Sequence, residues 1–421
     1  MNWQAIEDAF SSSETLTLFS LTGLPTKGRA KSTSRQTTLL GIPFGRTVAV
    51  TKKVDPGLLD YYTGLELGPK RVVVLDGTAN LSADDVLLEN SSRMPSYSHL
   101  AGLCPSPQSR ELTRLWNADH AFAECSSDVF RRVLGRDFLL LKCRDHISTL
   151  PAMSVPEAQR LGSVVVWQKM NRFSQGLLLR QYYSVFGDAI HPVKSLAELE
   201  LILQTENPEG KLLVPNVPRD RIVQDLEIAF SVENGRGELL GAVRQIIEKN
   251  RHVGSTDVEL SPEVLSQLND LVDGLAMRLH AEGFFRGIFG LDGFVVEEER
   301  GLRFLAYDLN PCLSQAFFPL FQKRKIENRL GKARHFVTHL YSILPEISFE
   351  ELEQSGALVT SRGARGMYPI LFDCIASEGP AFGRTSLMAM FLSDTRFDLQ
   401  EQILTFEAKM GRGRKIYKLP F

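Results

Sequence analysis

The chain has 421 residues, enough for two to four packed units of the usual domain size, so a large buried interior is expected. It carries 48 basic and 50 acidic residues, a formal net charge of −2, and no long tract of either sign. Such a balance lacks the electrostatic footprint of nucleic-acid binding, so we expect no nucleic-acid partner.

The cysteines and the hydropathy pattern indicate the compartment. The five cysteines are scattered, odd in number and without a CxxC pair, which argues against a zinc site or a disulfide framework. The N-terminal stretch has no basic region followed by a long apolar run, and no stretch approaches about 18 uninterrupted apolar residues. We therefore expect a soluble, cytoplasmic protein without a membrane partner.

The first 160 residues predict an arm followed by an α/β domain. Residues 13–38 are rich in Ser, Thr, Lys and Arg and show little periodicity, so we expect residues 1–40 to form a flexible arm. Further along, "TVAVT", "KRVVVLDG" and "FLLLKC" resemble buried strands, while residues 108–134 show apolar residues at helical intervals. This alternation predicts a mainly parallel sheet.

The next segment predicts a mixture of helices and antiparallel strands. Residues 162–187 are expected to form a strand, a loop and then a helix, followed by a helix in "SLAELELILQ" and a strand in "KLLVPN". Two β-rich runs flank "ENGRGE", whose Asn-Gly pair predicts a hairpin. A capped amphipathic helix then begins at Ser261 and is closed by Gly283.

Residues 285–317, "FRGIFGLDGFVVEEERGLRFLAYDLNPCLSQAF", have the pattern of a second hairpin. With a turn at "EEERG", Val296 faces Leu302, so Asp292 lies opposite Ala306 and diagonal to Asp308. Asn310 shares that face, and two carboxylates with one carboxamide suit Mg²⁺, which prefers oxygen ligands. The alternative is a half-exposed hairpin whose polar residues simply face solvent, and a slip of one residue would part the two acids.

The segments "GIFGLDGFVV" and "RFLAYDLNP" resemble the closing motif of the ATP-grasp superfamily, and the layout over residues 41–390 is most similar to the pheganomycin-type peptide ligases. The resemblance implies that Asp292, Asp308 and Asn310 are ligands of Mg²⁺ that bridges the phosphates of ATP. The chain departs from the family in three places. Asp308 replaces the usual Glu, Gly290 stands where an arginine is often found, and the glycine-rich flap is missing between residues 205 and 220.

The resemblance also implies a domain order. It predicts a pre-ATP-grasp α/β domain over residues 41–160, followed by an ATP-grasp fold of two α+β subdomains. The central, or lid, subdomain is expected at 161–260, the C-terminal metal and ATP subdomain at 261–345, and a C-terminal extension at 346–421.

The activity implied by the resemblance is that of an ATP-dependent carboxylate–amine ligase that works through an acylphosphate, in amino-acid or natural-product metabolism. Its partners would be a small-molecule carboxylate and an amine (an amino acid, a peptide or a carrier-bound group), and a homodimer is common for the fold. A non-catalytic relative that binds nucleotide or a partner, or a phosphotransferase on the same fold, are the alternatives.

The remaining contacts of ATP are assigned by the same resemblance, although each basic side chain could equally be a solvated surface cation. The candidates are Lys211, Lys169 and Arg172 for the phosphates, Gln224, Asp225 and Glu227 for the nucleotide near the linker, and Arg286 or Arg365 for a catalytic charge, with Arg244 as a further source of that charge.

Overall fold

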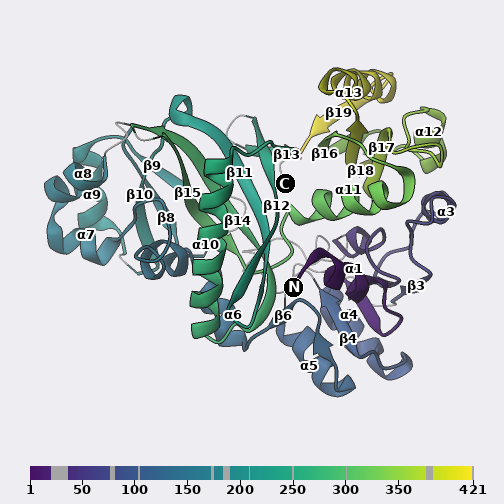
Figure 1. Cartoon of the computed structure of the whole chain (residues 1–421), viewed down its shortest axis with the longest axis horizontal. Helices are drawn as coiled ribbons and strands as arrows, with labels where there is room; N and C mark the ends of the chain where they lie inside the picture. Colours follow the sequence, from purple (N-terminus) through teal and green to yellow (C-terminus); the bar gives the residue numbers. More distant parts are fainter. Residues whose placement is uncertain are drawn as a thin grey trace.

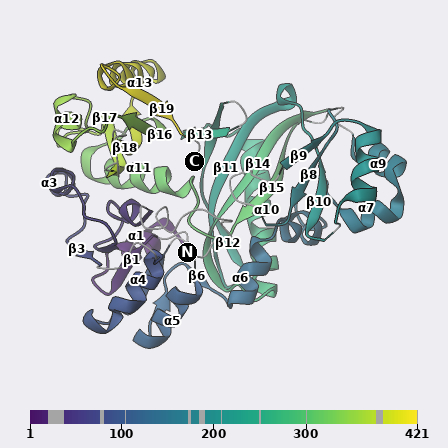
Figure 2. The same cartoon turned by 180° about the vertical axis from the view of Figure 1, so that it is seen from behind.

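The computed structural model describes residues 1–19, 37–75, 81–102, 105–171, 175–183, 190–207, 209–248, 251–299, 301–375 and 383–419. Three β-sheets organise this part of the chain, as Figure 1 and, from behind, Figure 2 show. In the described ranges, no helix has the length and apolar character needed to cross a membrane.

The first sheet has five parallel strands in the order β3-β2-β1-β4-β5. Its central strand is β1 (Thr15–Leu18), in which all four residues are buried, and α1 (Trp3–Ser11) precedes it. The predicted flexible arm is therefore wrong over residues 1–19. The reason is that Ile6 and Phe10 of α1 pack in the main core, together with Phe19 just after β1.

The rest of this sheet confirms the expected α/β order. Two of the predicted strands, "TVAVT" and "KRVVVLDG", contain β2 (Thr47–Val50) and β3 (Arg71–Val74). The other elements are η1 (Thr37–Gly41), α3 (Pro56–Gly64), α4 (Ala83–Asn90), η2 (Ser91–Arg93), β4 (His99–Gly102), α5 (Pro107–Trp116) and β5 (Asp119–His120).

The segment after β5 crosses to the large sheet. It contains β6 (Ala123–Glu124), which pairs with the large sheet, α6 (Ser127–Leu134) and η3 (Phe138–Lys142). The strand predicted in "FLLLKC" is wrong, because this segment is the π-helical turn η3. Its first three side chains are all buried, and a short apolar run of this kind has the same pattern in a buried helix as in a strand.

The second sheet has four strands in the order β7-β10-β8-β9 and lies to the left in Figure 1. Its strands are β7 (Met153–Ser154), β8 (Leu177–Gln181), β9 (Ile190–Val193) and β10 (Lys211–Pro215), and its helices are α7 (Val155–Leu161), α8 (Ser163–Met170) and α9 (Leu196–Thr205). The helix in "SLAELELILQ" and the strand in "KLLVPN" are confirmed.

Two elements of this unit are the reverse of the prediction. Residues 163–170, expected as a strand, form α8, and residues 177–181, expected in a helix, form β8. In α8 the buried residues Val166 and Met170 are four apart, which is a helical interval, while the valines at 164 and 165 are exposed. Short runs of valine or leucine do not decide between the two structures by themselves.

The third sheet is the largest, with the order β15-β14-β11-β12-β13-β16-β18-β17, to which β6 and β19 add at β14 and β16. Its first part holds η4 (Arg219–Arg221), β11 (Ile222–Glu233), β12 (Arg236–Glu248), β13 (Arg251–Thr256), α10 (Pro262–Ala281), β14 (Arg286–Glu298) and β15 (Gly301–Asn310). The predicted Asn-Gly turn is confirmed, since Asn234 and Gly235 both have the positive φ that a tight hairpin requires. The helix from Ser261 is confirmed as α10.

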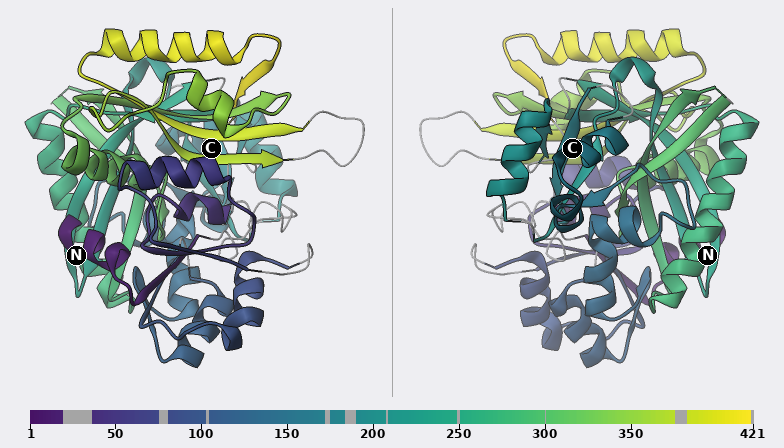
Figure 3. Two further views of the ribbon diagram at one scale, coloured as in Figure 1. Left: turned by 90° about the vertical axis from the view of Figure 1, so that its right-hand side faces the viewer. Right: turned by 90° about the vertical axis from the view of Figure 1, so that its left-hand side faces the viewer.

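The C-terminal residues complete this sheet. They form α11 (Phe317–Leu330), β16 (His335–Leu344), α12 (Phe349–Gln354), β17 (Gly366–Ile375), β18 (Arg384–Ser393), α13 (Arg396–Met410) and β19 (Lys415–Lys418). Figure 3 shows α13 lying along the top of the molecule. Strands β11–β13 belong to the large sheet and not to the small one, so the predicted lid range 161–260 includes strands of both, and the domain limits themselves stay a prediction.

Candidate functional site

Three carboxylates lie side by side on neighbouring strands of the large sheet. Glu227 on β11 is the register partner of Asp292 on β14, and Asp292 is the partner of Asp308 on β15. We call Glu227, Asp292 and Asp308 the acid row. Directly opposed residues share a face of the sheet, where like charges are destabilising unless another group compensates.

The hairpin β14–β15 differs in register from the prediction. Val296 pairs with Arg303, and the register shifts between Asp292 and Gly293, so that Asp308 and not Ala306 faces Asp292. The shift is a β-bulge, which inserts one extra residue into one strand. As a result the two acids, expected to be diagonal neighbours, are directly opposed.

Asp292 lies in the middle of the row and is held by two amide side chains. The Nε2 of Gln245 on β12 donates to Oδ1 at 2.7 Å, and the Nδ2 of Asn310 donates to Oδ2 at 3.2 Å. Burial raises the pKa of Asp292 well above its usual range, and the charges of Glu227 and Asp308 raise it further. Asp292, Asp308 and Asn310 do lie together, as the sequence suggested.

Glu227 is only 3% exposed and closes the row on the side of β11. Burial raises the pKa of Glu227, and hydrogen bonds from the backbone N–H groups of Ala316 and Gln315 oppose that shift. The loop after β15 therefore wraps around this carboxylate. The sequence analysis placed Glu227 near the nucleotide but did not recognise it as a neighbour of Asp292.

Two buried arginines neutralise the other end of the row. Arg136, just before η3, donates from Nε and Nη2 to Asp308 Oδ2 at 3.0 and 2.8 Å, and Arg180 of β8 approaches the same oxygen at 3.4 Å. Their side chains are 6% and 8% exposed. Burial lowers the pKa of Arg180, and the charge of Arg136 lowers it further. In the described part of the chain, the buried Nε of Arg180 finds no acceptor.

The sequence analysis missed both arginines. Arg180 stands in the apolar run "LLLRQ", which was expected to be helical, and a cation inside a run of leucines was the available signal. Arg136 carried no such signal, because it reaches the site through a π-helical turn that is distant in sequence from β15.

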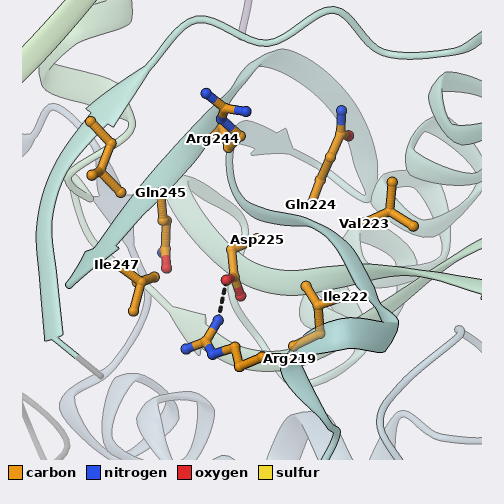
Figure 4. Close-up of a pocket in the computed structure, with 9 residues that line it drawn as sticks. Arg219, Ile222, Val223, Gln224, Asp225, Arg244, Gln245 and Ile247 are labelled. Carbon is orange, nitrogen blue, oxygen red and sulfur yellow. Dashed lines mark hydrogen bonds and ion pairs between the residues drawn. The ribbon is translucent and has the colours of Figure 1, made fainter. Parts of the chain in front are cut away.

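A slot opens in the sheet beside the acid row. The pairing of β11 with β12 ends at Leu226 and Arg244, although β11 starts at Ile222 and β12 continues to Glu248. The strands diverge there and leave a cavity of about 520 Å³ (Figure 4). Its lining residues are Arg219, Ile222, Val223, Gln224, Asp225, Arg244, Gln245, Ile246 and Ile247.

Two of the predicted nucleotide residues, Gln224 and Asp225, are in the wall of this slot. Asp225 forms an ion pair with Arg219, drawn in Figure 4. Burial raises the pKa of Asp225, and the charge of Arg219 opposes the shift. Gln245 joins the slot to the acid row, because it lines the slot and also donates to Asp292.

In the described part of the chain, the two predicted phosphate-binding lysines form no ion pair with the acid row. Lys211 on β10 forms an ion pair with Glu206, and Lys169 is exposed on α8, which the prediction took for a strand. Arg172 lies outside the described residues.

The two predicted catalytic arginines are also separate from the row. Arg286 is at the start of β14, six residues or about 20 Å from Asp292 along an extended strand, and pairs with Glu124 at 3.5 Å. Arg365 is 65% exposed and pairs with Asp394 at the far end of the sheet, beside β17 and β18. The distances of these arginines from the acid row depend on the order of strands in the sheet, which the sequence does not show.

The acid row has the donor set for a hard cation but does not enclose one. Carboxylate and carboxamide oxygens suit Mg²⁺, which is usually held by one or two carboxylates and by phosphate oxygens of its substrate. Over the described ranges, no three His, Cys, Asp or Glu side chains form a metal-holding group by themselves. Asp292, Asp308 and Asn310 therefore fit an ion that shares its coordination with a nucleotide.

Comparison with known proteins identifies the fold of the chain through solved structures. No family model and no curated protein sequence matches the chain. Solved structures do match over most of its length. N5-carboxyaminoimidazole ribonucleotide synthetase from Thermus thermophilus is 13% identical, with a TM-score of 0.55 over 94% of this chain and 98% of that one.

Two further matches are biotin carboxylases. The biotin carboxylase of Campylobacter jejuni, in a β-γ-ATP complex, is 8% identical, with a TM-score of 0.56 over 96% of this chain and 92% of that one. The biotin carboxylase domain of the Hydrogenobacter thermophilus 2-oxoglutarate carboxylase, with MgADP, is 12% identical, with a TM-score of 0.53 over 88% and 90%. The chain therefore has the ATP-grasp fold that the hairpin motif suggested.

Proposed function

We propose that the protein is an ATP-dependent ligase that joins a carboxylate to an amine. The observation that carries this proposal is the acid row with Asn310, set between two buried arginines and a slot large enough for part of a nucleotide. The solved structures of the same fold include complexes with ATP and with MgADP, which supports ATP as the co-substrate.

Asp292, Asp308 and Asn310 would hold Mg²⁺, and Mg²⁺ would supply charge neutralisation at the phosphates. In the structure, Arg136 and Arg180 pair with Asp308. We infer that when ATP binds, its phosphates replace Asp308 as the partners of these two guanidiniums. Asp308 is then freed for the cation. The unpartnered Nε of Arg180 supports this exchange, since a buried donor without an acceptor in the described part of the chain suits an anionic ligand.

The reaction we propose has two steps. A carboxylate oxygen of the substrate attacks the γ-phosphorus of ATP, the bond to the β-phosphate oxygen breaks, and an acylphosphate and ADP form. The amine nitrogen then attacks the acyl carbon, phosphate leaves with the C–O bond electrons, and the nitrogen loses a proton. The chain's own contribution is position and charge, so no nucleophilic side chain is needed.

The finer assignments are part of this proposal. Gln224 and Asp225 would contact the nucleotide in the slot. Arg136 and Arg180 would bind the phosphates, for which the sequence suggested Lys211, Lys169 and Arg172. They would also supply the catalytic charge, for which it suggested Arg286 or Arg365. Amino acids or peptides are the substrates to test first, in keeping with the resemblance to peptide ligases.

The test is ADP release from MgATP against amino acids and dipeptides, singly and in pairs. We expect turnover that needs both a carboxylate and an amine, and a loss of at least about 100-fold in Asp292→Asn and in Arg180→Gln. Arg365→Gln, a matched arginine far from the row, should keep full activity. Nucleotide binding without ADP release under every condition would favour the non-catalytic alternative.

A further inference from the structure

A second cavity lies on the face of the large sheet opposite the acid row. Gln245 points to Asp292, so its neighbours Arg244 and Ile246 point to the other face, because side chains alternate along a strand. There α13 and β19 cover part of β12, β13 and β16, and a cavity of about 340 Å³ remains between helix and sheet. A volume of this size is at the lower end of small-molecule sites.

The walls of this cavity are mostly apolar. They come from both the sheet and the helix, namely Ile246, Val337, Leu399, Ile403 and Leu404. Leu404 is 59% exposed although it faces a cavity, so the groove is open to solvent along α13. A ligand for it needs an apolar middle.

One end of the cavity is basic. Arg244 and Arg396 are both in its lining, and Arg396 already pairs with Asp257 at 2.9 Å. Arg244 has no ion-pair partner among the residues that the structure describes. The same end holds the first turn of α13, which already contains Asp398 and is capped by the side chain of Thr395, so Arg244 is the cation left for a ligand. A carboxylate is therefore the group this end lacks.

The other end is acidic. Glu248 and Glu407 line it, and Glu407 is satisfied by Lys418 at 3.1 Å and by the hydroxyl of Tyr341 at 2.9 Å. Among the side chains that the structure describes, Glu248, like Arg244, has no ion-pair partner, and the other charge that lines this end, Lys418, is paired with Glu407. An ammonium group is the complementary charge for this end.

The separation of the ends sets the length of the ligand. Arg244 and Glu248 are four residues apart on an extended strand, about 13 Å, and their side chains shorten the gap when they reach inwards. An extended peptide spans about 3.5 Å per residue. A single amino acid, whose two charges sit on one carbon, is too short to reach both ends, whereas two or three linked residues fit.

We propose that this cavity binds a di- or tripeptide with apolar side chains and free termini, its carboxylate at Arg244 and its ammonium at Glu248. The cavity is separated by the sheet from the acid row, so the binding of the peptide does not depend on the proposed ligase function.

Binding is measured by calorimetry on the full chain without ATP, with the tripeptide Ala-Leu-Ala and its N-acetylated and C-amidated forms. We expect the free peptide to bind and each cap to weaken it by about two- to fivefold, since each removes one contact to an exposed charge. Glu248→Gln should weaken binding of the free peptide but leave binding of the N-acetylated peptide unchanged. Arg244→Gln should weaken binding of the free peptide but leave binding of the amidated peptide unchanged. Arg236→Gln, on the same strand but outside the cavity, is the control.

No binding of the free peptide, or equal binding of all three forms, overturns the proposal even if a variant fails to fold. Peptide binding with no ADP release from MgATP, whatever carboxylate and amine are added, would remove the ligase function and leave the peptide site standing.

Discussion

At the scale of single residues, Asp308 is the group on which the site depends. Its carboxylate lies against two guanidiniums, those of Arg136 and Arg180, that are almost fully buried. Removing one partner of a buried charged group leaves the others uncompensated, which costs about 3–5 kcal/mol. We expect Asp308→Ala to lower the free energy of unfolding by that order and to abolish ADP release, as urea denaturation and the ADP assay would show.

The matched comparison is Asp394→Ala, which also removes the partner of an arginine, but of the exposed Arg365. An exposed pair contributes about 0–1 kcal/mol, so this variant should stay close to the wild type. Equal losses in the two variants would mean that the arginine cluster does not matter for stability.

Gly290 occupies a position with no space for a side chain. A Cβ at this position would overlap the Cβ of Ser314, in the loop whose next two N–H groups reach Glu227. A larger residue has no space there. We expect Gly290→Ala to destabilise the protein by about 1–3 kcal/mol in thermal or urea unfolding. Gly64→Ala, which meets nothing within 4 Å, should be neutral, and a neutral Gly290→Ala would contradict the contact.

At the scale of elements, α11 is joined to the N-terminal unit by a partly buried lysine, Lys325. Lys325 Nζ donates to the carbonyl oxygens of Pro43 and Leu67 at 2.7 and 3.1 Å, and burial lowers the pKa of Lys325 to about 8. The unfolded chain then binds more protons than the folded one between about pH 8 and 10.5, so stability rises with pH across that window.

The gain from Lys325 is at most about 3 kcal/mol. To measure it, the free energies of unfolding of the wild type and of Lys325→Met are determined by urea denaturation from about pH 7 to 10. The difference between them isolates Lys325, because the other groups that titrate in this range contribute equally to both proteins. Lys323→Met on the same helix is the control. A difference that does not change with pH would show that Lys325 keeps an ordinary pKa.

At the scale of the whole molecule, the site links two sheets. Arg180 comes from the small sheet and Asp308 from the large one, so a ligand that binds both arginine and acid row must act on the arrangement of the two units. MgATP at about 100 times its Kd should stabilise the folded chain by about 2.7 kcal/mol. A rise in Tm should follow, with slower hydrogen exchange in β8 and β10, and Arg180→Gln should reduce both. ATP binding without protection of the small sheet would contradict this coupling.

Local sequence patterns were enough to predict the elements that have clear caps, turn residues or periodicity. The capped helix α10, the Asn-Gly hairpin β11–β12 and the alternating hairpin β14–β15 were all predictable, because caps, turn residues and periodicity act within a few residues of chain. Short apolar runs were not: "FLLLKC" and the two halves of residues 162–187 went to the wrong class, since their pattern fits either structure and only the packing around them decides.

The sequence by itself determined the chemistry of the site, in that Asp292, Asp308 and Asn310 are oxygen donors at the spacing of one strand face. Only the tertiary structure decided their neighbours: Glu227 comes from the adjacent strand through register, and Arg136 and Arg180 come from segments more than 100 residues away. The tertiary structure also separated Arg286 and Arg365 from the acids. The physical reason is that residue type and spacing fix what a side chain offers locally, whereas a buried charge is matched by whatever the packing of distant elements brings to it.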